Sequence, residues 1–322
     1  MSEKIISIEN SAYLSVDTSR IVIEQADNKN YVAAKDIAVL IVSSFQVKLT
    51  AAVISAITTN GGLILFTNSN YMPTSYCYAN NMNNAGAIRP YLQAQLIGSR
   101  TSAVAWQQII QSKIKGQATI LNNHQTQSYN YINSAHKLVE LGDATNIEAQ
   151  VAKVYWQDYF NLFNLTMNRE KRGASNIINI CLNYGYSVIR AMVARSLASL
   201  GLCLNFGIGH YRKDNPFNLV EDFVEPFRYI VDESVYKILQ NFDFQNENLE
   251  LTPQIKQLLL KHIYNYTIIL RNKNYRLMQG IHEVNTSYCQ YLQYSAVNSL
   301  VLPHILVPGV PKKAISNTLQ EY

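Results

Sequence analysis

Charged side chains are scarce in this chain. Asp, Glu, Lys and Arg make up 15% of its 322 residues, and 27 basic residues against 22 acidic ones leave a net charge of +5. That excess allows contact with a polyanion but is too small to indicate one by itself. A chain of this length can form two domains, each with a substantial core.

Cysteines and long apolar runs are also few. The four cysteines, Cys77, Cys181, Cys203 and Cys289, lie far apart without a C-x-x-C pair, which argues against a zinc site or a disulfide framework. No apolar run approaches the roughly 20 residues that span a bilayer, and the N-terminus lacks the features of a secretory signal. We therefore expect a cytoplasmic protein with reduced cysteines and no membrane contact.

The first part of the chain predicts a small β-rich domain over residues 1–80. Short runs of β-branched and apolar residues are bounded there by Asn, Asp and Ser, and one helix is expected over 49–59, ending at Asn60 and Gly61. We find no catalytic constellation in this region and expect a scaffold or dimerisation role.

The remainder predicts a different architecture. Residues 81–90 are polar, rich in Asn and end in proline, which is typical of a linker. Residues 91–302 are expected to form a larger all-α domain, and 303–322 a flexible tail. The predicted fold class is therefore α+β, with a β-sandwich-like N-terminal domain before a helical one.

One stretch of the helical part, residues 215–228 (NPFNLVEDFVEPFR), is unusually acidic. If it is helical from Asn218, Asp222 and Glu225 are neighbours at i and i+3. Pro226 has no N–H to offer the carbonyl of Asp222, so a kink is expected beside these carboxylates. With His210 just before them, they could bind a divalent metal, where oxygen ligands suit Mg²⁺ and one imidazole favours Mn²⁺. A solvated acidic surface is the alternative.

Two other expected helices carry polar residues of interest. A helix from about Asn146, with Asp143 or Thr145 as N-cap, has Glu148 in its first turn, where an acid complements the helix dipole but also shares a face with aromatic residues. A second helix, Ile177 to Leu200, is apolar nearly all round and bears a polar stripe. This stripe indicates either an internal hydrogen-bond network or a wall facing a metal or phosphate. Its members are Asn179, Asn183, Ser187 and Arg190.

Basic residues have a less specific pattern. Lys113 and Lys115, on a core helix expected over 103–122, are predicted to be solvated, and the charged turn 169–172 is either surface or a phosphate contact. The segment 256–276 interleaves basic residues with tyrosines, as nucleic-acid contacts do, although a solvent-exposed face has the same pattern.

Taken together, these patterns resemble the CRISPR-associated spacer-acquisition integrase family. The resemblance spans about residues 5–300, and its motifs are specific only in combination. The acidic stretch is similar to the branch that accompanies type II CRISPR systems. The matching segments are Trp106 with Lys113, Ile114 and Gln117; residues 147–155; 182–186 (LNYGY); 207–210 (GIGH); and 215–228.

The resemblance assigns roles to particular residues. It implies Glu148, His210 and Glu225 as catalytic metal ligands, although many relatives carry Asp where Glu225 stands. It implies that Asp222, Asn183 and Tyr184 support these ligands, whereas Glu221 is left as a surface acid. The residues expected to bind DNA are Arg190, Arg271, Lys273 and Arg276.

The resemblance also implies a reaction and an assembly. The 3′-hydroxyl of a short DNA fragment would attack a phosphodiester at the edge of a CRISPR repeat, with Mg²⁺ or Mn²⁺ as cofactor. The expected partners are double-stranded DNA, a second copy of the chain, and a small CRISPR adaptation protein in a heterohexamer-like complex. Two alternatives remain: a metal-dependent nuclease of branched nucleic acids without integration, and a non-catalytic DNA-binding assembly protein.

Overall fold

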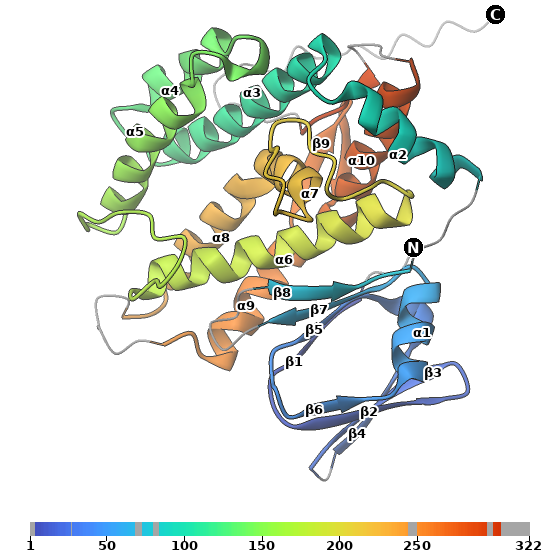
Figure 1. Cartoon of the computed structure of the whole chain (residues 1–322). Coiled ribbons are helices and arrows are strands. Elements are labelled where there is room, and N and C mark those ends of the chain that lie inside the picture. Colours follow the sequence, from blue (N-terminus) through green and yellow to red (C-terminus); the bar gives the residue numbers. More distant parts are fainter. Residues whose placement is uncertain are drawn as a thin grey trace, which may run out of the picture.

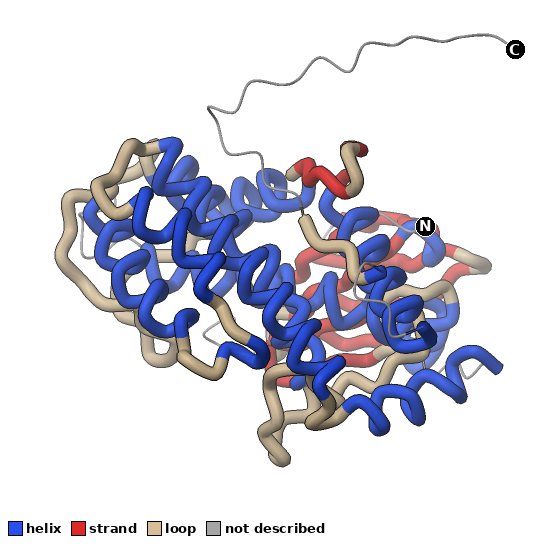
Figure 2. Tube along the Cα trace, turned by 90° about the horizontal axis from the view of Figure 1, so that it is seen from above, coloured by secondary structure: helices blue, strands red, loops and turns tan. Residues whose placement is uncertain are grey.

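A strand-rich N-terminal part packs beneath a set of long helices (Figure 1). The computed structural model of the chain describes residues 4–26, 28–67, 73–79, 84–243, 250–294 and 299–303. Seen from above, the helices extend beyond the strands on one side (Figure 2). The predicted order of a β-rich region followed by a helical one is confirmed.

The N-terminal part contains two four-stranded sheets facing each other. The first has the order β1 (Lys4–Ile8), β5 (Ile37–Val42), β7 (Leu63–Thr67), β8 (Pro73–Cys77). The second has the order β4 (Asn28–Ala33), β3 (Arg20–Gln25), β2 (Ala12–Asp17), β6 (Val47–Leu49). A short helix, α1 (Ala51–Thr59), ends close to the predicted position, and its last turn is followed by Gly61 with a positive φ of 77°.

Strand β5 joins the two halves of the molecule. It pairs in parallel with both β1 and β7, and all six of its residues are buried. Ile37, Leu40 and Val42 belong to the core between the sheets, whereas Val39 and Ile41 belong to the core of the helical part. A strand covered on both faces is expected to be a continuous apolar run, which is what the sequence of β5 shows.

The helical part is built around α6. Its 23 residues pack against α7, α8, α10 and strand β5, and Figure 1 shows α6 directly above the sheet. Its bounds and those of its neighbours are α2 (Asn84–Leu96), α3 (Arg100–Asn123), α4 (Tyr129–Ala135), α5 (Ile147–Asn161), α6 (Ile177–Ser199), α7 (Asn218–Val224), α8 (Arg228–Leu239), α9 (Pro253–Tyr264) and α10 (Leu277–Tyr294). Three-residue 3-10 turns are η1 (Ala34–Asp36), η2 (His136–Leu138), η3 (Leu141–Asp143) and η4 (Glu225–Phe227).

Helix α6 is also, among the described residues, the one helix long and apolar enough to cross a membrane by length and composition. However, 83% of its most apolar window is buried inside the protein. Its apolar character therefore has an explanation within the fold, because a helix covered by neighbours on all sides needs apolar residues on all sides.

Two expectations need correction. Residues 84–90, predicted to lie in a linker, form the first half of α2. This helix binds the loop after α6 through Gln93, whose side chain accepts from the backbone N–H of Cys203 at 2.8 Å and donates to the carbonyl of Cys203 at 3.1 Å.

The domain predicted to be all-α also contains a hairpin of β9 (Thr267–Leu270) and β10 (Lys273–Arg276). Its two turn residues, Arg271 and Asn272, have φ of 47° and 64°, as a tight hairpin requires. The predicted tail beyond Pro303 lies outside the described residues.

Candidate functional site

A cavity of about 680 Å³ opens between α3, α5, α6 and the segment that contains α7 and η4. Its lining includes Glu148, His210 and Glu225, the three predicted metal ligands, together with Arg190 and Asn183. Five other predicted site residues do not line it: Asp222, which is buried next to His210, and four more distant ones. Tyr184 is buried elsewhere in the core, and Arg271, Lys273 and Arg276 lie on the β9–β10 hairpin.

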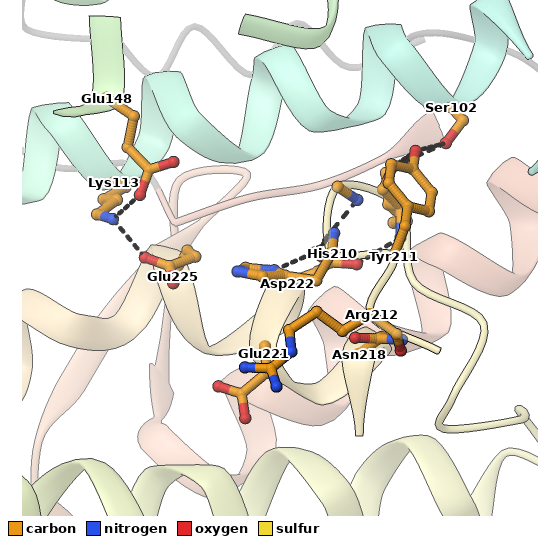
Figure 3. A network of polar contacts seen from close by, with 12 residues as sticks. Ser102, Lys113, Glu148, His210, Tyr211, Arg212, Asn218, Glu221, Asp222 and Glu225 are labelled. Carbon is orange, nitrogen blue, oxygen red and sulfur yellow. Dashed lines mark hydrogen bonds and ion pairs between the residues drawn. The ribbon is translucent and has the colours of Figure 1, made fainter. Parts of the chain in front are cut away.

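His210 reaches the cavity from a glycine-containing loop wrapped around the Asp222 carboxylate (Figure 3). Asp222 is fully buried and accepts from the backbone N–H groups of Ile208, Gly209 (3.2 Å) and His210 (3.0 Å). The Nδ1–H of His210 donates to the same carboxylate at 2.7 Å. Asp222 therefore fixes the loop and the imidazole together.

The two glycines of this loop are required by close packing. A Cβ at Gly207 would lie 2.1 Å from the carbonyl oxygen of His210, and one at Gly209 would lie 2.2 Å from the ring of Trp106. Trp106 also meets the imidazole of His210 edge-on, with 5.4 Å between ring centroids. The motif residue Trp106 on α3 therefore packs against both the loop and the imidazole that the loop carries.

The pairing with Asp222 determines how His210 can act. Burial alone would lower the pKa of His210, but the hydrogen bond and negative charge of Asp222 outweigh it and raise the pKa above its ordinary value. Because Nδ1 carries the proton donated to Asp222, Nε2 is the ring nitrogen left to bind a ligand. This carboxylate–imidazole arrangement is the one that commonly orients a metal-binding histidine.

The kink expected at Pro226 is present. Helix α7 ends at Val224, and the turn η4 follows, in which the N–H of Glu225 donates to the carbonyl of Asp222. Helix α8 then begins at Arg228. The tightened turn gives the backbone carbonyl of Asp222 a hydrogen-bond donor, which Pro226 cannot provide. Glu225, the first residue of η4, lines the cavity.

A cluster of four charges occupies one side of the cavity. The ammonium of Lys113 lies 2.6 Å from a carboxylate oxygen of Glu225 and also pairs with Glu148 (Figure 3). Arg228 binds both oxygens of Glu225 at 2.8 Å. The prediction that Lys113 is solvated is wrong, because its side chain is only 9% exposed and lies between two carboxylates.

These contacts control the charge of each group. Burial would raise the pKa of Glu225, but Arg228 and Lys113 hold it well below its usual range. Burial would likewise lower the pKa of Lys113, and the carboxylates of Glu225 and Glu148 raise it instead. Glu225 and Lys113 are therefore both ionised at neutral pH, each beside a group of opposite charge.

Glu148 is placed by the start of α5. The carboxylate of Asp143, one of the two predicted caps, accepts from the N–H groups of Ile147 (2.8 Å) and Glu148 (3.1 Å). Asn146, in a left-handed conformation with φ of 54°, occupies the N-cap position, directly before Ile147. Asp143 thus satisfies the free N–H groups of the helix end, and the Glu148 carboxylate is left to turn towards Lys113.

In the parts of the chain that the structure describes, no three His, Cys, Asp or Glu side chains converge closely enough to hold a metal ion. The carboxylates of Glu148 and Glu225 instead pair with Lys113, and the carboxylate of Asp222 binds the Nδ1–H of His210. The donor chemistry nevertheless fits a divalent ion, because two carboxylates and a free imidazole nitrogen line the same cavity.

Many of the residues that line the cavity are basic, and few of them were recognised from the sequence. Arg169 is held by the side-chain oxygens of Asn179 (3.1 Å) and Asn183 (2.6 Å), and lies 5.4 Å from the ring centres of Trp156 and Tyr186. The polar stripe of α6 is thus partly a network that fixes an arginine. The basic residues lining the cavity are Lys113, Arg169, Lys171, Arg172, Arg190, Arg212 and Arg228.

Lys171 and Arg190 differ in their partners. Arg190 pairs with Glu221 at 2.7 Å, and the Glu221 side chain is only 16% exposed, so the description of Glu221 as a surface acid is wrong. Among the described residues Lys171 has no ion pair. Burial and the neighbouring charges of Arg228 and Lys113 lower its pKa. This uncompensated positive charge favours an anion in the cavity.

A third buried carboxylate, Asp232, also lines the cavity. It accepts from the hydroxyls of Tyr155 (2.6 Å) and Tyr186, and burial raises its pKa to about 6 although both hydrogen bonds oppose the shift. Tyr186 also lies against the guanidinium groups of Arg169 and Arg228. Asp232 therefore fixes the aromatic ring on which two cavity arginines rest.

The missed residues left some signal in the sequence. Lys113 follows Ile109 and Ile110 on the apolar face of its helix, where a charged residue needs a partner. Arg228 stands three residues after Glu225, a spacing that allows an ion pair on one helical face. Nothing in the spacing of residues 169–172 shows that this loop turns into the cavity.

A strand-rich part, a helical part and a cavity lined by both carboxylates and many basic side chains define the class of protein to which this chain belongs. The sequence profile of the family described as CRISPR associated protein Cas1 matches residues 5–269, and the chain belongs to this family of endonuclease- and integrase-like proteins.

Individual relatives agree with this assignment. The chain is 29% identical over 309 residues to a CRISPR-associated endonuclease Cas1 of Neisseria meningitidis, covering 95% of this chain and 97% of the relative. Among solved structures it resembles a casposase bound to integration product (TM-score 0.77, 18% identity, 92% of both chains). It also resembles a chain of a Cas6-RT-Cas1–Cas2 complex (TM-score 0.76, 13% identity), covering 93% of this chain and 36% of that one. At these identities the two structures show a shared fold.

Proposed function

We propose that this protein is a metal-dependent DNA endonuclease and integrase of CRISPR adaptation. It would join the 3′-hydroxyl ends of short foreign DNA fragments to the CRISPR repeat by transesterification. One observation carries the proposal: two carboxylates and an imidazole anchored by Asp222 line the same cavity as several basic residues. Membership of the Cas1 family supports it independently.

Each group has a role in this reaction. Glu148, Glu225 and Nε2 of His210 would hold Mg²⁺ or Mn²⁺. A bound divalent ion stabilises charge on phosphoryl oxygens and lowers the pKa of the attacking or leaving hydroxyl. Asp222 holds His210 in the tautomer with a free Nε2. Lys171 and Arg169 would neutralise the phosphate that enters the cavity, in place of the hairpin residues expected from the sequence.

Two solved relatives support the proposal that the protein acts on DNA together with a small partner protein. One solved relative is a casposase bound to integration product and another belongs to a complex containing Cas2. We extend this to double-stranded DNA as substrate and to a Cas2-like small partner that joins two homodimers in a heterohexamer-like complex. The named relatives come from prokaryotes, and we place the protein in the prokaryotic cytoplasm.

The test is a joining assay. Labelled DNA with a free 3′-hydroxyl is incubated with the protein, a repeat-bearing plasmid, the small partner and Mn²⁺. Label should transfer to the plasmid with wild type and be lost with His210→Ala and Glu225→Ala. Asp17→Ala, which alters an exposed acid of the β2–β3 hairpin, should retain activity.

The other outcomes separate the alternatives. Cleavage without joining would indicate a metal-dependent nuclease. DNA binding without cleavage, unaffected by both variants, would indicate an assembly protein. Joining that persists in His210→Ala and Glu225→Ala would refute the proposed metal ligands.

A further inference from the structure

Lys113 occupies a position of particular consequence for the proposed metal site. Its ammonium contacts Glu148 on α5 and Glu225 on η4, residues that come from two separate segments of the chain (Figure 3). The Lys113 and Glu225 side chains are 9% and 3% exposed, so this contact is buried. A buried ion pair of this kind is held by packing as well as by charge.

The surrounding structure keeps Lys113 in place. It lies on α3, whose next turn carries Gly116 against the ring of Tyr229, where a Cβ would come within 2.6 Å of that ring. Arg228 completes the cluster from the far side of Glu225. Two carboxylates and two cations therefore neutralise one another without any added ion.

A divalent ion would need the same oxygens. Mg²⁺ and related ions bind carboxylate oxygens at about 2.0–2.6 Å, close to the 2.6 Å that separates the Lys113 nitrogen from Glu225. Two cations that close together repel strongly in a buried site. The ion and the ammonium therefore cannot contact both carboxylates at the same time.

We propose that Lys113 is an internal counter-ion that competes with the divalent metal for Glu148 and Glu225, an inference that rests on the proposed function. Metal binding displaces the ammonium, which then lies in a cavity that DNA phosphate enters. A phosphate gives the displaced ammonium a new anionic partner. DNA therefore strengthens metal binding, and the free protein binds metal weakly.

The test measures Mn²⁺ binding directly, by titration calorimetry and by the electron paramagnetic resonance signal of free Mn²⁺, without any activity assay. Lys113→Met removes the charge and keeps the length of the side chain, and Lys113→Gln is a second neutral variant. Lys113→Arg keeps the charge. Lys115→Met, two residues along the same helix but not among the cavity-lining residues, is the matched control.

We expect both neutral variants to bind Mn²⁺ at least fivefold more tightly than wild type, while Lys113→Arg and Lys115→Met stay within twofold. A short DNA duplex should tighten Mn²⁺ binding by wild type and have a smaller effect on the neutral variants. Thermal unfolding should show a lower Tm for Lys113→Met without metal and a larger rise on adding Mn²⁺.

Three results would overturn the inference. If wild type binds Mn²⁺ and the neutral variants bind it equally or less tightly, Lys113 does not compete with the metal, and the proposed metal site stands. If neither wild type nor any variant binds Mn²⁺ with or without DNA, both the inference and the proposed metal dependence fail. A neutral variant that unfolds without metal and does not refold on adding Mn²⁺ also counts against competition.

Discussion

At the scale of single residues, buried charges account for the site. Asp222, Glu225 and Lys113 are nearly or wholly inaccessible to solvent, and each binds an opposite charge, a backbone N–H group or both. Removing one member of such a group leaves the others buried without compensation, which costs more free energy than the intact pair contributes. Substitutions here should therefore affect stability and function together, in proportions that depend on which partner is removed.

The first prediction concerns Asp222. Asp222→Asn removes the charge that accepts the Nδ1–H of His210 and should weaken Mn²⁺ binding by about 10–100-fold, as loss of a carboxylate behind a metal-binding histidine commonly does. Three backbone N–H groups also lose a charged acceptor. Calorimetric Mn²⁺ titration and urea unfolding measure the two effects. Unchanged Mn²⁺ affinity would show that His210 needs no anchoring by Asp222.

The second prediction concerns Asp232 and pH. Its pKa in the folded protein is about 6, raised from 3.8 by burial, so the folded state keeps a proton that the unfolded chain has lost between about pH 4 and 6. The free energy of unfolding should therefore fall as pH rises through this range, by about 3 kcal/mol from this residue.

Asp232→Asn has no carboxyl to ionise and should lack this component of the pH dependence. Urea unfolding of both proteins at pH 4, 5, 6 and 7 gives the comparison. The stability of wild type relative to the variant should decrease steadily with pH. Parallel curves would mean that Asp232 ionises in the folded protein at its ordinary pKa.

At the scale of elements, two basic segments were candidates for binding DNA, and the structure separates them. The loop between α5 and α6 contributes Arg169, Lys171 and Arg172 to the cavity, whereas the β9–β10 hairpin carries Arg271 and Lys273 outside it. The loop is fixed by Asn179 and Asn183 of α6. Position relative to the carboxylates, which composition does not reveal, distinguishes these segments.

The third prediction follows from that separation. The double variant Lys171→Ala with Arg172→Ala should lower DNA affinity and reduce the slope of log affinity against log salt by about 2, one for each phosphate that is no longer neutralised. Arg271→Ala with Lys273→Ala, which removes the same charge from the hairpin, is the matched comparison. Fluorescence anisotropy with a labelled duplex at several salt concentrations measures both. A larger effect of the hairpin variant would restore the hairpin as the main DNA-binding segment.

At the scale of the whole molecule, polar contacts reinforce the apolar contact between the sheets and the helices. Glu9, which follows β1, pairs with Lys256 on α9 at 3.1 Å, and the Lys256 side chain is only 2% exposed. Arg195 on α6 donates to the carbonyl of Gly61, which follows α1, at 2.7 Å. Both contacts join segments far apart in the sequence, so they form only when the two parts dock.

The fourth prediction tests this docking. Glu9→Gln leaves the buried ammonium of Lys256 without the carboxylate of Glu9 and should lower the free energy of unfolding by about 1–3 kcal/mol. Asp36→Asn, which breaks the exposed pair with Lys4, should cost less than about 1 kcal/mol. Urea unfolding compares the two. Equal costs would show that the contact between the two parts does not depend on this ion pair.

Local patterns in the sequence determined much of the fold and the types of residue in the site. Runs of β-branched residues predicted the strand-rich beginning, and apolar residues on all faces predicted the buried helix α6. Pro226 predicted the kink before Arg228. Each of these features depends on neighbours within a few residues. Local patterns did not predict the helix over residues 84–90 or the β9–β10 hairpin. Helix α2 is held to the loop after α6 by Gln93, a contact between segments far apart in the sequence.

Only the tertiary structure decided which charges meet. Lys113, Glu148 and Glu225 lie on different elements, and their spacing along the chain says nothing about the distance between their side chains. Likewise, packing of α5 and α6 turns the loop at 169–172 into the cavity and leaves the hairpin outside it. The sequence thus determined the family and the candidate ligands, whereas long-range packing determined that a lysine lies between two of them. Contacts of this kind arise from the docking of whole helices, which no short window of sequence contains.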